Sequence, residues 1–296
     1  MNSVKPADGK PFRVDPECYP CFLRQAVIAL EACASEEALR HRVMKAVLQD
    51  MERMDTARSP AHATTSMHRT IRRMTCPDPF GGIKRQYNEK ALALYPGLRD
   101  LSLRSPEPLL TAARLAIAGN AIDFGIYRSV DVEAAVKRAL EEPLAVDGSG
   151  EFLEAVGRAR DILFLLDNAG EAVFDRILME VLAMGGKRVT AVAKGSPVIN
   201  DCTVEDARQA GVDAAAALVD NGSDAVGTIL ETTSPAFRER FAASDLIISK
   251  GQGNFETLMD RPENIFFLFQ SKCKVLSRFL GLEPGSMLLV GPGGRG

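Results

Sequence analysis

The feature that most limits the possible folds is an apolar run at residues 162–166, which ends abruptly at Asp167 and Asn168. Five consecutive apolar residues are too few for an ordinary helix and are typical of a strand buried on both faces. An Ala-Gly turn follows, and apolar residues then recur at helical spacing over residues 173–184. A strand followed by a helix is half of a parallel crossover unit, and ligands bind at the carboxyl edge of sheets built from such units. The sequence therefore predicts an α/β fold with a site near Asp167.

Apolar runs continue to alternate with helical segments toward the end of the chain. About six strands are expected, and those after the first cover residues 189–193, 214–219, 246–248, 265–269 and 287–290. Between them, residues 203–206 resemble a helix capping box, Ser234 precedes a proline as at a helix start, and Gly281 is typical of a helix end. This alternation predicts a mostly parallel sheet with helices on both faces.

The first half of the chain shows helical signals and almost no strand pattern. Residues 1–14 are polar, include Pro and Gly, and are expected to form a flexible tail. A helix start is expected at Asp15, and further helices near residues 36–55, 61–73, 84–94, 107–119 and 131–141. Pro, Gly and Ser near residues 142–150 mark the change of pattern. The sequence thus predicts an all-helical part over residues 15–145 and an α/β/α domain over residues 146–296.

Composition excludes several classes of protein. Lys and Arg total 36 against 39 acidic residues, and without a long basic run this near balance gives no sign of nucleic-acid binding. No secretory pattern and no run of about 18 apolar residues is present, so we expect a cytoplasmic protein without membrane insertion. Six scattered cysteines are then expected to be reduced thiols. The sequence leaves the oligomeric state open.

Polar side chains follow three of the expected strands. Asp167 and Asn168 follow the first, Asn200 and Asp201 lie just beyond the second, and Lys250 begins a Lys-Gly-Gln-Gly-Asn loop after the fourth. Because the carboxyl ends of parallel strands meet at one edge, we expect these clusters to lie together. Asp167, Asn168 and Asp201 would offer three oxygen ligands, which suit Mg²⁺ or Mn²⁺ better than Zn²⁺. Each cluster taken alone also fits an ordinary turn or helix cap.

Lys250 and the glycines after it have the components of an anion site. An ammonium group donates hydrogen bonds and cannot ligate a cation, whereas glycines let backbone N–H groups approach a phosphate closely. We therefore expect Lys250 to bind phosphate. The loop lacks the spacing of a P-loop or of a GxGxxG fingerprint, so a nucleotide cofactor is not favoured.

Together with Cys18-Tyr-Pro-Cys21, these motifs resemble those of the metal-dependent damage-control phosphatases, a family also called domain of unknown function 89 and acidic-residue-methyltransferase-like metal-binding domain. The segments Gly119-Asn120-Ala-Ile-Asp123 and Ser271-Lys272-Cys273 also look like family motifs, and the resemblance covers nearly the whole chain. The motifs are specific for the family only in combination, and the CxxC pair suggests a separate branch of the family. The resemblance implies a helical N-terminal part packed on a three-layer α/β/α domain.

The resemblance also implies roles for single residues. A divalent ion (Mg, Mn, Co or Ni) would be held by Asp167, Asn168 and Asp201, which with Lys250 form the expected catalytic set. The expected substrate-binding residues are Glu171, Asn200, Lys250, Gln252, Gly253, Asn254, Lys272, Asn120 and Asp123. Whether a carboxylate such as Asp201 or Glu171 acts as base or nucleophile is left open by the sequence. Cys18 and Cys21 fit structural packing about as well as a metal or redox role, because no second pair of ligands lies at zinc spacing.

The sequence therefore predicts a metal-dependent phosphatase that hydrolyses a small phosphorylated metabolite, such as a sugar phosphate, a nucleotide or a pantetheine-type phosphate. Two alternatives remain. One is an S-adenosylmethionine-dependent carboxyl methyltransferase, although no glycine-rich signature for that cofactor occurs at the first strand turn. The other is a non-catalytic regulatory module that binds a metal or a nucleotide.

Overall fold

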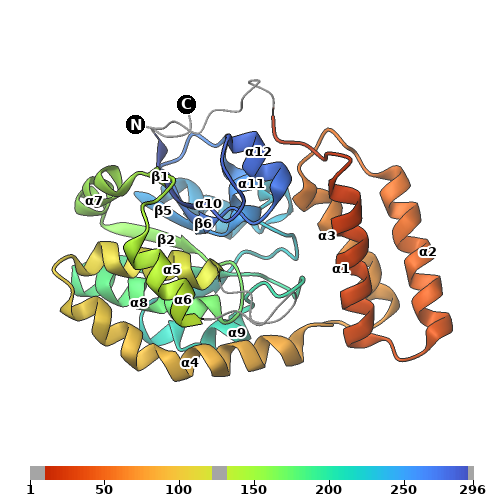
Figure 1. Cartoon of the computed structure of the whole chain (residues 1–296), viewed down its shortest axis with the longest axis horizontal. Helices are drawn as coiled ribbons and strands as arrows, with labels where there is room; N and C mark the ends of the chain where they lie inside the picture. Colours follow the sequence, from red (N-terminus) through yellow and green to blue (C-terminus); the bar gives the residue numbers. More distant parts are fainter. Residues whose placement is uncertain (1–10, 122–131, 293–296) are drawn as a thin grey trace.

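A mostly parallel sheet forms the centre of the computed structural model, which describes residues 11–121 and 132–292 (Figure 1). Within these ranges the sheet has seven strands in the order β1-β7-β6-β5-β2-β3-β4, and only the β6–β7 pair is antiparallel. The strands are β1 (Val146–Asp147), β2 (Asp161–Leu165), β3 (Arg188–Ala193), β4 (Ala217–Asp220), β5 (Leu246–Lys250), β6 (Ile265–Gln270) and β7 (Met287–Val290). The expected α/β class with a mostly parallel sheet is thus confirmed, and β1 is a short strand that the sequence pattern did not reveal.

The order of the strands creates a topological switch point beside β2. The chain moves outward from β2 to β3 and β4 on one side, and then returns to the other side of β2 to form β5 and β6. The crossover connections therefore leave β2 and β5 in opposite directions, and their carboxyl ends flank a topological switch point. Ligands bind at this place in open α/β sheets.

Helices cover both faces of the sheet. They bury the apolar side chains of β2, which point alternately to one face and to the other. Ile162 and Phe164 belong to one buried cluster, and Leu163 and Leu165 belong to the other. The first cluster lies beneath α4 (Gly81–Arg104), α5 (Pro108–Ala121), α6 (Val132–Glu141), α7 (Ser149–Arg158), α8 (Glu171–Met184) and α9 (Val204–Gln209). The second lies beneath α10 (Pro235–Ala243), α11 (Gln252–Leu258) and α12 (Lys274–Leu280). The result is the expected three-layer arrangement.

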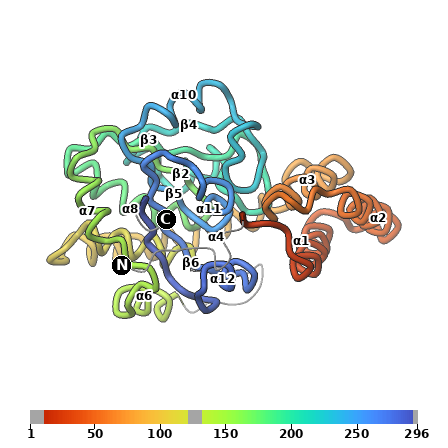
Figure 2. Tube along the Cα trace, turned by 90° about the horizontal axis from the view of Figure 1, so that it is seen from above, coloured from red at the N-terminus to blue at the C-terminus, as the bar shows by residue number. Residues whose placement is uncertain are grey.

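Helices α1 (Cys18–Cys33), α2 (Glu37–Arg53) and α3 (Pro60–Met74) form a separate group at one end of the molecule (Figure 2). Helix α3 is joined to the loop after β4 because Arg69 and Arg72 both pair with Asp224. At the other side of this group, Arg278 of α12 pairs with Glu17 just before α1. These contacts attach the three helices to the α/β layers at the carboxyl edge of the sheet.

Local signals in the sequence explain several element ends. Thr203 and Asp206 form the expected capping box of α9, Ser234 caps α10 through Phe237, and Gly281 ends α12 in the left-handed region at φ 69°. Helix α4 is longer than expected and continues through Pro96. Of the expected tail, residues 1–10 lie outside the described residues, and the Phe12 ring is buried against Phe279 with 5.0 Å between centroids. No described helix has the length and apolar character needed to cross a membrane.

Candidate active site

Backbone hydrogen bonds bring the first two polar clusters together. Beyond the end of β2, the carbonyl of Asp167 accepts from the Cys202 amide at 2.7 Å, and the Ala169 amide donates to the Asn200 carbonyl at 2.9 Å. Asn168 and Asp201 consequently form an isolated antiparallel bridge. The structure therefore places the three expected metal ligands, Asp167, Asn168 and Asp201, on two adjacent loop segments at the switch point.

Two amide side chains hold the carboxylates of this edge. Asn168 Nδ2 donates to Asp167 Oδ2 at 2.7 Å, and Asn120 Nδ2 donates to the same oxygen at 3.1 Å. Asn120 also donates to Glu171 Oε2 at 3.0 Å, while its own oxygen accepts from the Gln270 amide. Asn120 is thus fixed from three directions, although it comes from α5 in the helical half of the chain. Asp123 lies outside the described residues.

The electrostatics of the site favour an added cation. Burial raises the pKa of Asp167 well above its usual range, and the charges of Glu171 and Asp201 raise it further. Burial likewise raises the pKa of Asp201, against the opposing charge of Lys194. Asp201 Oδ2 accepts no hydrogen bond from any described residue, although the atom is buried. A carboxylate that is buried without enough positive charge or hydrogen bonds around it is unstable in its ionised form. A bound cation stabilises that form.

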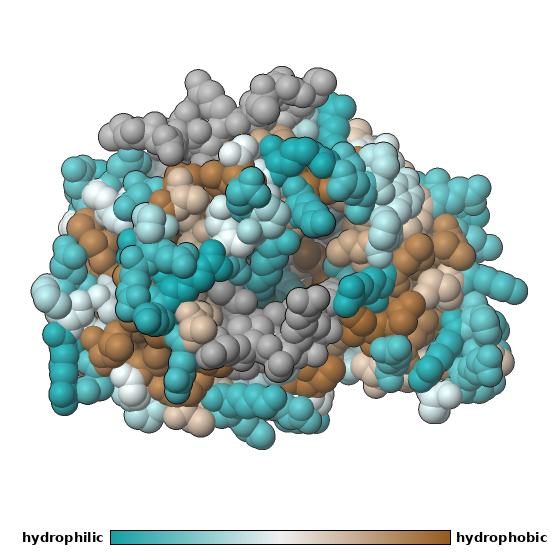
Figure 3. Space-filling view, in the orientation of Figure 1, coloured by the Kyte–Doolittle hydropathy of each residue, from teal (hydrophilic) through white to brown (hydrophobic). Residues whose placement is uncertain are grey.

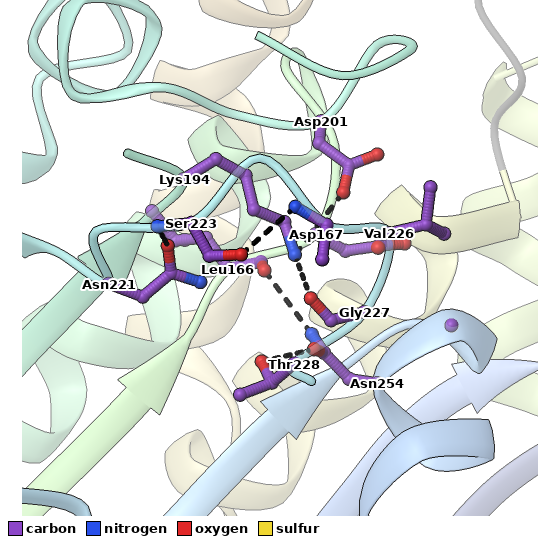
Figure 4. A network of polar contacts seen from close by, with 12 residues as sticks. Leu166, Asp167, Lys194, Asp201, Asn221, Ser223, Val226, Gly227, Thr228 and Asn254 are labelled. Atoms are coloured by element: carbon purple, nitrogen blue, oxygen red, sulfur yellow. Dashed lines mark hydrogen bonds and ion pairs between the residues drawn. The ribbon is translucent and has the colours of Figure 1, made fainter. Parts of the chain in front are cut away.

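Lys194 is the cation that pairs with Asp201 Oδ2. It follows β3 directly, and its Nζ lies 3.4 Å from Asp201 Oδ2 and donates to the carbonyl of Gly227 (Figure 4). Only 3% of Lys194 is exposed. Its charge lowers the pKa of both Asp167 and Asp201, but it does not offset their burial. Lys194 therefore lies between the two carboxylates and the loop after β4.

Lys250 lies deeper than the sequence led us to expect. Its Nζ donates to Asp175 Oδ1 at 2.6 Å, to Glu171 and to the carbonyl of Ala116 at 2.9 Å, and the residue is 0% exposed. These three acceptors use all three N–H groups of the ammonium. Burial would lower the pKa of Lys250, but the charges of Asp175 and Glu171 outweigh it and raise the pKa. In this arrangement Lys250 has no donor left for a phosphate.

The loop after Lys250 packs tightly against the site. Gly251 has φ 79°, and a Cβ on it would lie 2.0 Å from Asp167 Oδ2, so this position requires glycine. Asn254 is 1% exposed and donates to the carbonyls of Lys250 and Leu166, while Thr228 donates to its Oδ1 at 2.7 Å (Figure 4). Asn254 thus joins three loops, and its polar atoms are occupied by the protein.

Gln252 and Lys272 differ from Asn254 because they lie nearer to solvent. Gln252 is half-buried, and its Oε1 accepts from the Lys272 amide at 3.3 Å. The Lys272 side chain is exposed, and its charge lowers the pKa of Asp167. Gly253 uses its carbonyl to accept from Thr257. Of the two lysines expected to bind substrate, Lys250 and Lys272, only Lys272 is therefore in a position that a ligand can reach.

The residues at the edge fit a hard divalent cation. All the donors are oxygens of carboxylate or amide groups, and one of them, Asp201 Oδ2, accepts no hydrogen bond from the described residues and pairs with Lys194 only at 3.4 Å. Within the described ranges, no three His, Cys, Asp or Glu side chains already converge as a metal site. The carboxylates of Asp167 and Asp201 and the side-chain amide of Asn168 therefore form the set that fits a divalent cation. The nitrogen and the oxygen of the Asn168 amide are assigned from its hydrogen bonds.

Two charged residues of this region were missed by sequence reasoning. Lys194 ends a predicted strand, as Lys250 does, so the same strand-edge argument would have selected it. Asp175 lies one helical turn after Glu171, on the buried side of α8. A carboxylate among the apolar core positions of a helix signals a buried partner, which here is Lys250.

Cys18 and Cys21 do not contact the proposed metal ligands. Burial raises the pKa of Cys18 to about 11, and the charged neighbours that raise it further are Cys273, Glu256 and Asp15. Cys21 is exposed and accepts from Gln25 at 3.6 Å. The pair therefore belongs to the contact between α1 and α12.

The carboxyl edge of the sheet faces the helical group α1–α3. Besides the ion pairs of Asp224, the Val226 amide donates to Thr65 Oγ1 of α3 at 3.0 Å. Figure 3 shows mainly hydrophilic side chains on the face seen in Figure 1, and a recess opens near the middle of that face, between the α/β layers and the helical group. The two parts of the molecule thus meet beside the candidate site.

Comparisons with known proteins agree with this architecture. The family model described as the damage-control phosphatase ARMT1-like domain matches residues 14–288. A crystal structure of a DUF89 family protein from Pyrococcus horikoshii superimposes with a TM-score of 0.82 at 31% identity, covering 95% of this chain and 99% of that chain. Both matches extend over the helical and the α/β parts.

Three relatives have similar sequences. A damage-control phosphatase of Pyrococcus horikoshii is 34% identical over 284 residues, covering 94% of this chain and 98% of the relative. A damage-control phosphatase of Archaeoglobus fulgidus is 31% identical, with 93% and 98% covered. An uncharacterised protein of Methanocaldococcus jannaschii is 34% identical, with 95% and 96% covered.

Proposed function

Because this chain belongs to the damage-control phosphatase ARMT1-like family, for which its relatives' names support a phosphatase role, we propose that it hydrolyses the phosphate monoester of a small metabolite with the help of a divalent cation. Mg²⁺, Mn²⁺, Co²⁺ and Ni²⁺ are the candidate ions. Sugar phosphates, nucleotides and pantetheine-type phosphates are the candidate substrates.

One observation supports the proposal most strongly. The bridge between Asn168 and Asp201 brings two strand-end loops together. There, a buried carboxylate oxygen of Asp201 accepts no hydrogen bond from the described residues and pairs with Lys194 only at 3.4 Å. Acidic and amide oxygens at the switch point of an α/β sheet suit a hard cation. The same edge carries Lys194 and Lys272, whose charges reach Asp167.

In the proposed reaction, Asp167, Asn168 and Asp201 would hold the cation. When bound, the cation supplies positive charge that neutralises phosphate oxygens. Lys272 approaches the phosphate from solvent, and Lys194 offsets the charge of Asp201 and of the incoming phosphate. Cationic groups fixed in advance near a phosphate lower the barrier because they need little reorganisation as charge moves.

The buried residues position the acidic ligands. Asn120 donates to Asp167 and Glu171, and Lys250 donates to Glu171 from below. At the first turn of α8, one carboxylate oxygen of Glu171 therefore accepts from Asn120 and the other accepts from Lys250. We propose that Lys250 acts through Glu171, and that Gln252 lies at the wall next to Lys272.

A phosphate-release assay over a panel of phosphorylated metabolites with the four ions tests the proposal. We expect release that depends on the ion, and a loss of roughly 10²-fold or more in Asp201→Asn, because the lost carboxylate weakens the hold on the cation. Asp220→Asn is the matched control, since Asp220 also ends a strand but is exposed and caps its own turn through the Gly222 amide at 2.8 Å.

The alternatives give different results in the same experiment. A methyltransferase would bind S-adenosylmethionine in a saturable manner and release no phosphate. A regulatory module would bind the ion or a nucleotide without turnover. Ion-independent phosphate release that is equal in wild type and Asp201→Asn would refute the proposed site.

A further inference from the structure

Two polar side chains of α4 are buried against the loops that carry the proposed metal ligands. These two ligand loops are residues 166–170, before α8, and residues 194–203, before α9. Lys84 and Asn88 lie one helical turn apart on the same face of α4 and are 1% and 0% exposed. Figure 1 shows α4 running along α8 and α9, and α4 contacts both helices. Buried polar groups require partners, and these two side chains find theirs beside the ligand loops.

The side-chain oxygen of Asn88 holds the first ligand loop. It accepts from the Gly170 amide at 2.6 Å, two residues after Asn168. Gly170 is the N-cap of α8 and has φ 79°, a backbone conformation that is open mainly to glycine. The neighbouring Ala169 amide donates to the carbonyl of Asn200 in the second ligand loop. The turn after Asn168 is therefore tied to the second loop on one side and to α4 on the other.

The side-chain nitrogen of Asn88 bonds to the helix that follows the second ligand loop. Nδ2 donates to the carbonyl of Asp206 at 2.8 Å and to Gln209 Oε1 at 3.1 Å, and both residues belong to α9. Because a backbone amide can only donate and a carbonyl can only accept, these bonds fix which way the Asn88 amide group points. Asn88 thus joins the turn after Asn168 to the helix that follows Asp201.

Lys84 fixes the helix to which Asn88 bonds. Its Nζ donates to Asp206 Oδ2 at 2.8 Å. The same oxygen accepts from the amide and the hydroxyl of Thr203, at 2.9 and 2.6 Å, where α9 begins. Thr203 is only two residues after Asp201. One face of α4 therefore holds the chain just after the ligands of both loops, through contacts that lie entirely within the protein.

We propose that Asn88 is a positioning residue for the metal site, which sets the placement of the two ligand loops before a cation binds. The inference rests on the proposed function, because it concerns the cation that Asp167, Asn168 and Asp201 would hold. Asn88 acts through the backbone of Gly170 and of α9, and not as a ligand. Groups that orient metal ligands typically change metal affinity by 10–100-fold when they are removed, and ligands fixed in advance lose less freedom on binding.

Calorimetric titration of Mn²⁺ into the full-length protein tests the inference. Asn88→Leu keeps a side chain of similar size but removes both the acceptor and the donor, and we expect Mn²⁺ to bind at least about tenfold more weakly. Ser102→Ala is the matched control, because Ser102 lies in the same helix, is 0% exposed and donates to the Pro108 carbonyl at 3.2 Å. Gln209→Ala removes one partner of Asn88 and leaves its bond to Gly170. Both control variants should bind Mn²⁺ with wild-type affinity.

A measurement on wild type decides the matter even if Asn88→Leu folds poorly. Amide hydrogen exchange is followed residue by residue by NMR, first in the metal-free protein and then with Mg²⁺. We expect the Gly170 amide to be protected already in the metal-free protein, because its hydrogen bond to Asn88 needs no cation. Protection that appears only with Mg²⁺ would show that the cation orders the turn, and would overturn the inference.

The outcomes of the titration separate this inference from the proposed function. Unchanged Mn²⁺ affinity in folded Asn88→Leu, beside weaker binding in Asp201→Asn, would overturn the inference alone. Equal weakening in Ser102→Ala would do the same, because any lost buried hydrogen bond of α4 would then have the effect. Wild type that binds no Mn²⁺ would overturn the proposed function and this inference with it.

Discussion

Two buried lysines at the carboxyl edge of the same sheet have opposite surroundings. Lys250, at the end of β5, gives its three N–H groups to Glu171, Asp175 and a backbone carbonyl. Lys194, after β3, faces Asp201 at 3.4 Å, where one carboxylate oxygen still accepts no hydrogen bond from the described residues. One carboxylate oxygen in each group, Asp175 Oδ2 and Asp201 Oδ2, accepts no hydrogen bond from the described residues. The groups differ because Lys250 contacts its carboxylates at hydrogen-bond distance, whereas Lys194 pairs with Asp201 only at 3.4 Å.

This difference separates a structural role from a binding role. A buried ion pair with all donors used needs no ligand, and its loss is felt as instability. A buried carboxylate whose lysine partner lies as far away as 3.4 Å is unstable in its ionised form, and a bound cation would stabilise that form. Residue type and strand-end position are the same in both cases. The two lysines differ in how deeply their side chains are buried and in which groups they contact.

The largest expected effect comes from Lys250→Met. Methionine keeps much of the side-chain volume but leaves Glu171 and Asp175 buried together without a counter-cation. We expect the free energy of unfolding to fall by about 3–5 kcal/mol. Urea unfolding measures the change, and the exposed Lys274→Met is the control, expected to stay within about 0.5 kcal/mol.

A different result would remove the distinction between the two lysines. If Lys250→Met unfolded like wild type and lost only kcat/KM, Lys250 would contact the phosphate directly, as its position after β5 first suggested. Its hydrogen bonds to Glu171 and Asp175 would then have to open when substrate binds.

A smaller effect, on activity alone, is expected for Lys194→Met. The variant loses a fixed cation beside Asp201, and we expect kcat/KM to drop by roughly 10²-fold, which corresponds to about 2.7 kcal/mol. Steady-state kinetics with the best substrate of the panel give this number. Lys187→Met, just before the opposite end of β3, should react at the wild-type rate. Equal rates for both variants would place Lys194 among the structural residues.

The smallest expected effect concerns a buried group outside the site. His68 of α3 is 1% exposed, and its Nε2 has no hydrogen-bond partner among the described residues. Burial lowers its pKa to about 3, and the charge of Arg72 adds to this. The imidazole is therefore neutral in the folded protein, and a neutral group tolerates a missing partner better than a carboxylate does.

The lowered pKa of His68 determines how the stability of the protein depends on pH. The unfolded chain takes up a proton below about pH 6.5 and the folded chain does so only near pH 3, so stability from this group is lost as the pH falls from 6.5. Between pH 6.5 and 5, wild type should lose about 2 kcal/mol more than His68→Leu. Urea unfolding at the two pH values measures this difference. Identical losses would mean that His68 is protonated when folded.

The layers of the fold could be predicted because burial imposes a period on the sequence. The apolar runs of β2, β3, β5, β6 and β7 and the caps at Thr203, Ser234 and Gly281 are local signals. The prediction for the third expected strand was less accurate. The expected strand at residues 214–219 is observed as Ala217–Asp220, because Gly211 in the left-handed region leads into a short 3-10 turn over Val212–Ala214.

The remaining differences depend on tertiary contacts. Helix α4 continues past Pro96 because its last turns are held on α8, where Tyr95 and Arg99 both bond to Glu180. The sequence placed Lys250 at the strand edge correctly, but the carboxylate of Asp175 that draws it inward comes from a helix 75 residues away. Neither partner is visible from local spacing.

The most direct test of the account is a calorimetric titration of Mn²⁺ into metal-free wild type, Asp201→Asn and Asp220→Asn. We predict about one ion per chain for wild type and Asp220→Asn, and at least tenfold weaker binding for Asp201→Asn. Metal-free Asp201→Asn should also be no less stable than wild type, because a neutral amide replaces a buried carboxylate. Binding of Mn²⁺ to Asp201→Asn with wild-type affinity would contradict the assignment of the Asp201 carboxylate as a metal ligand.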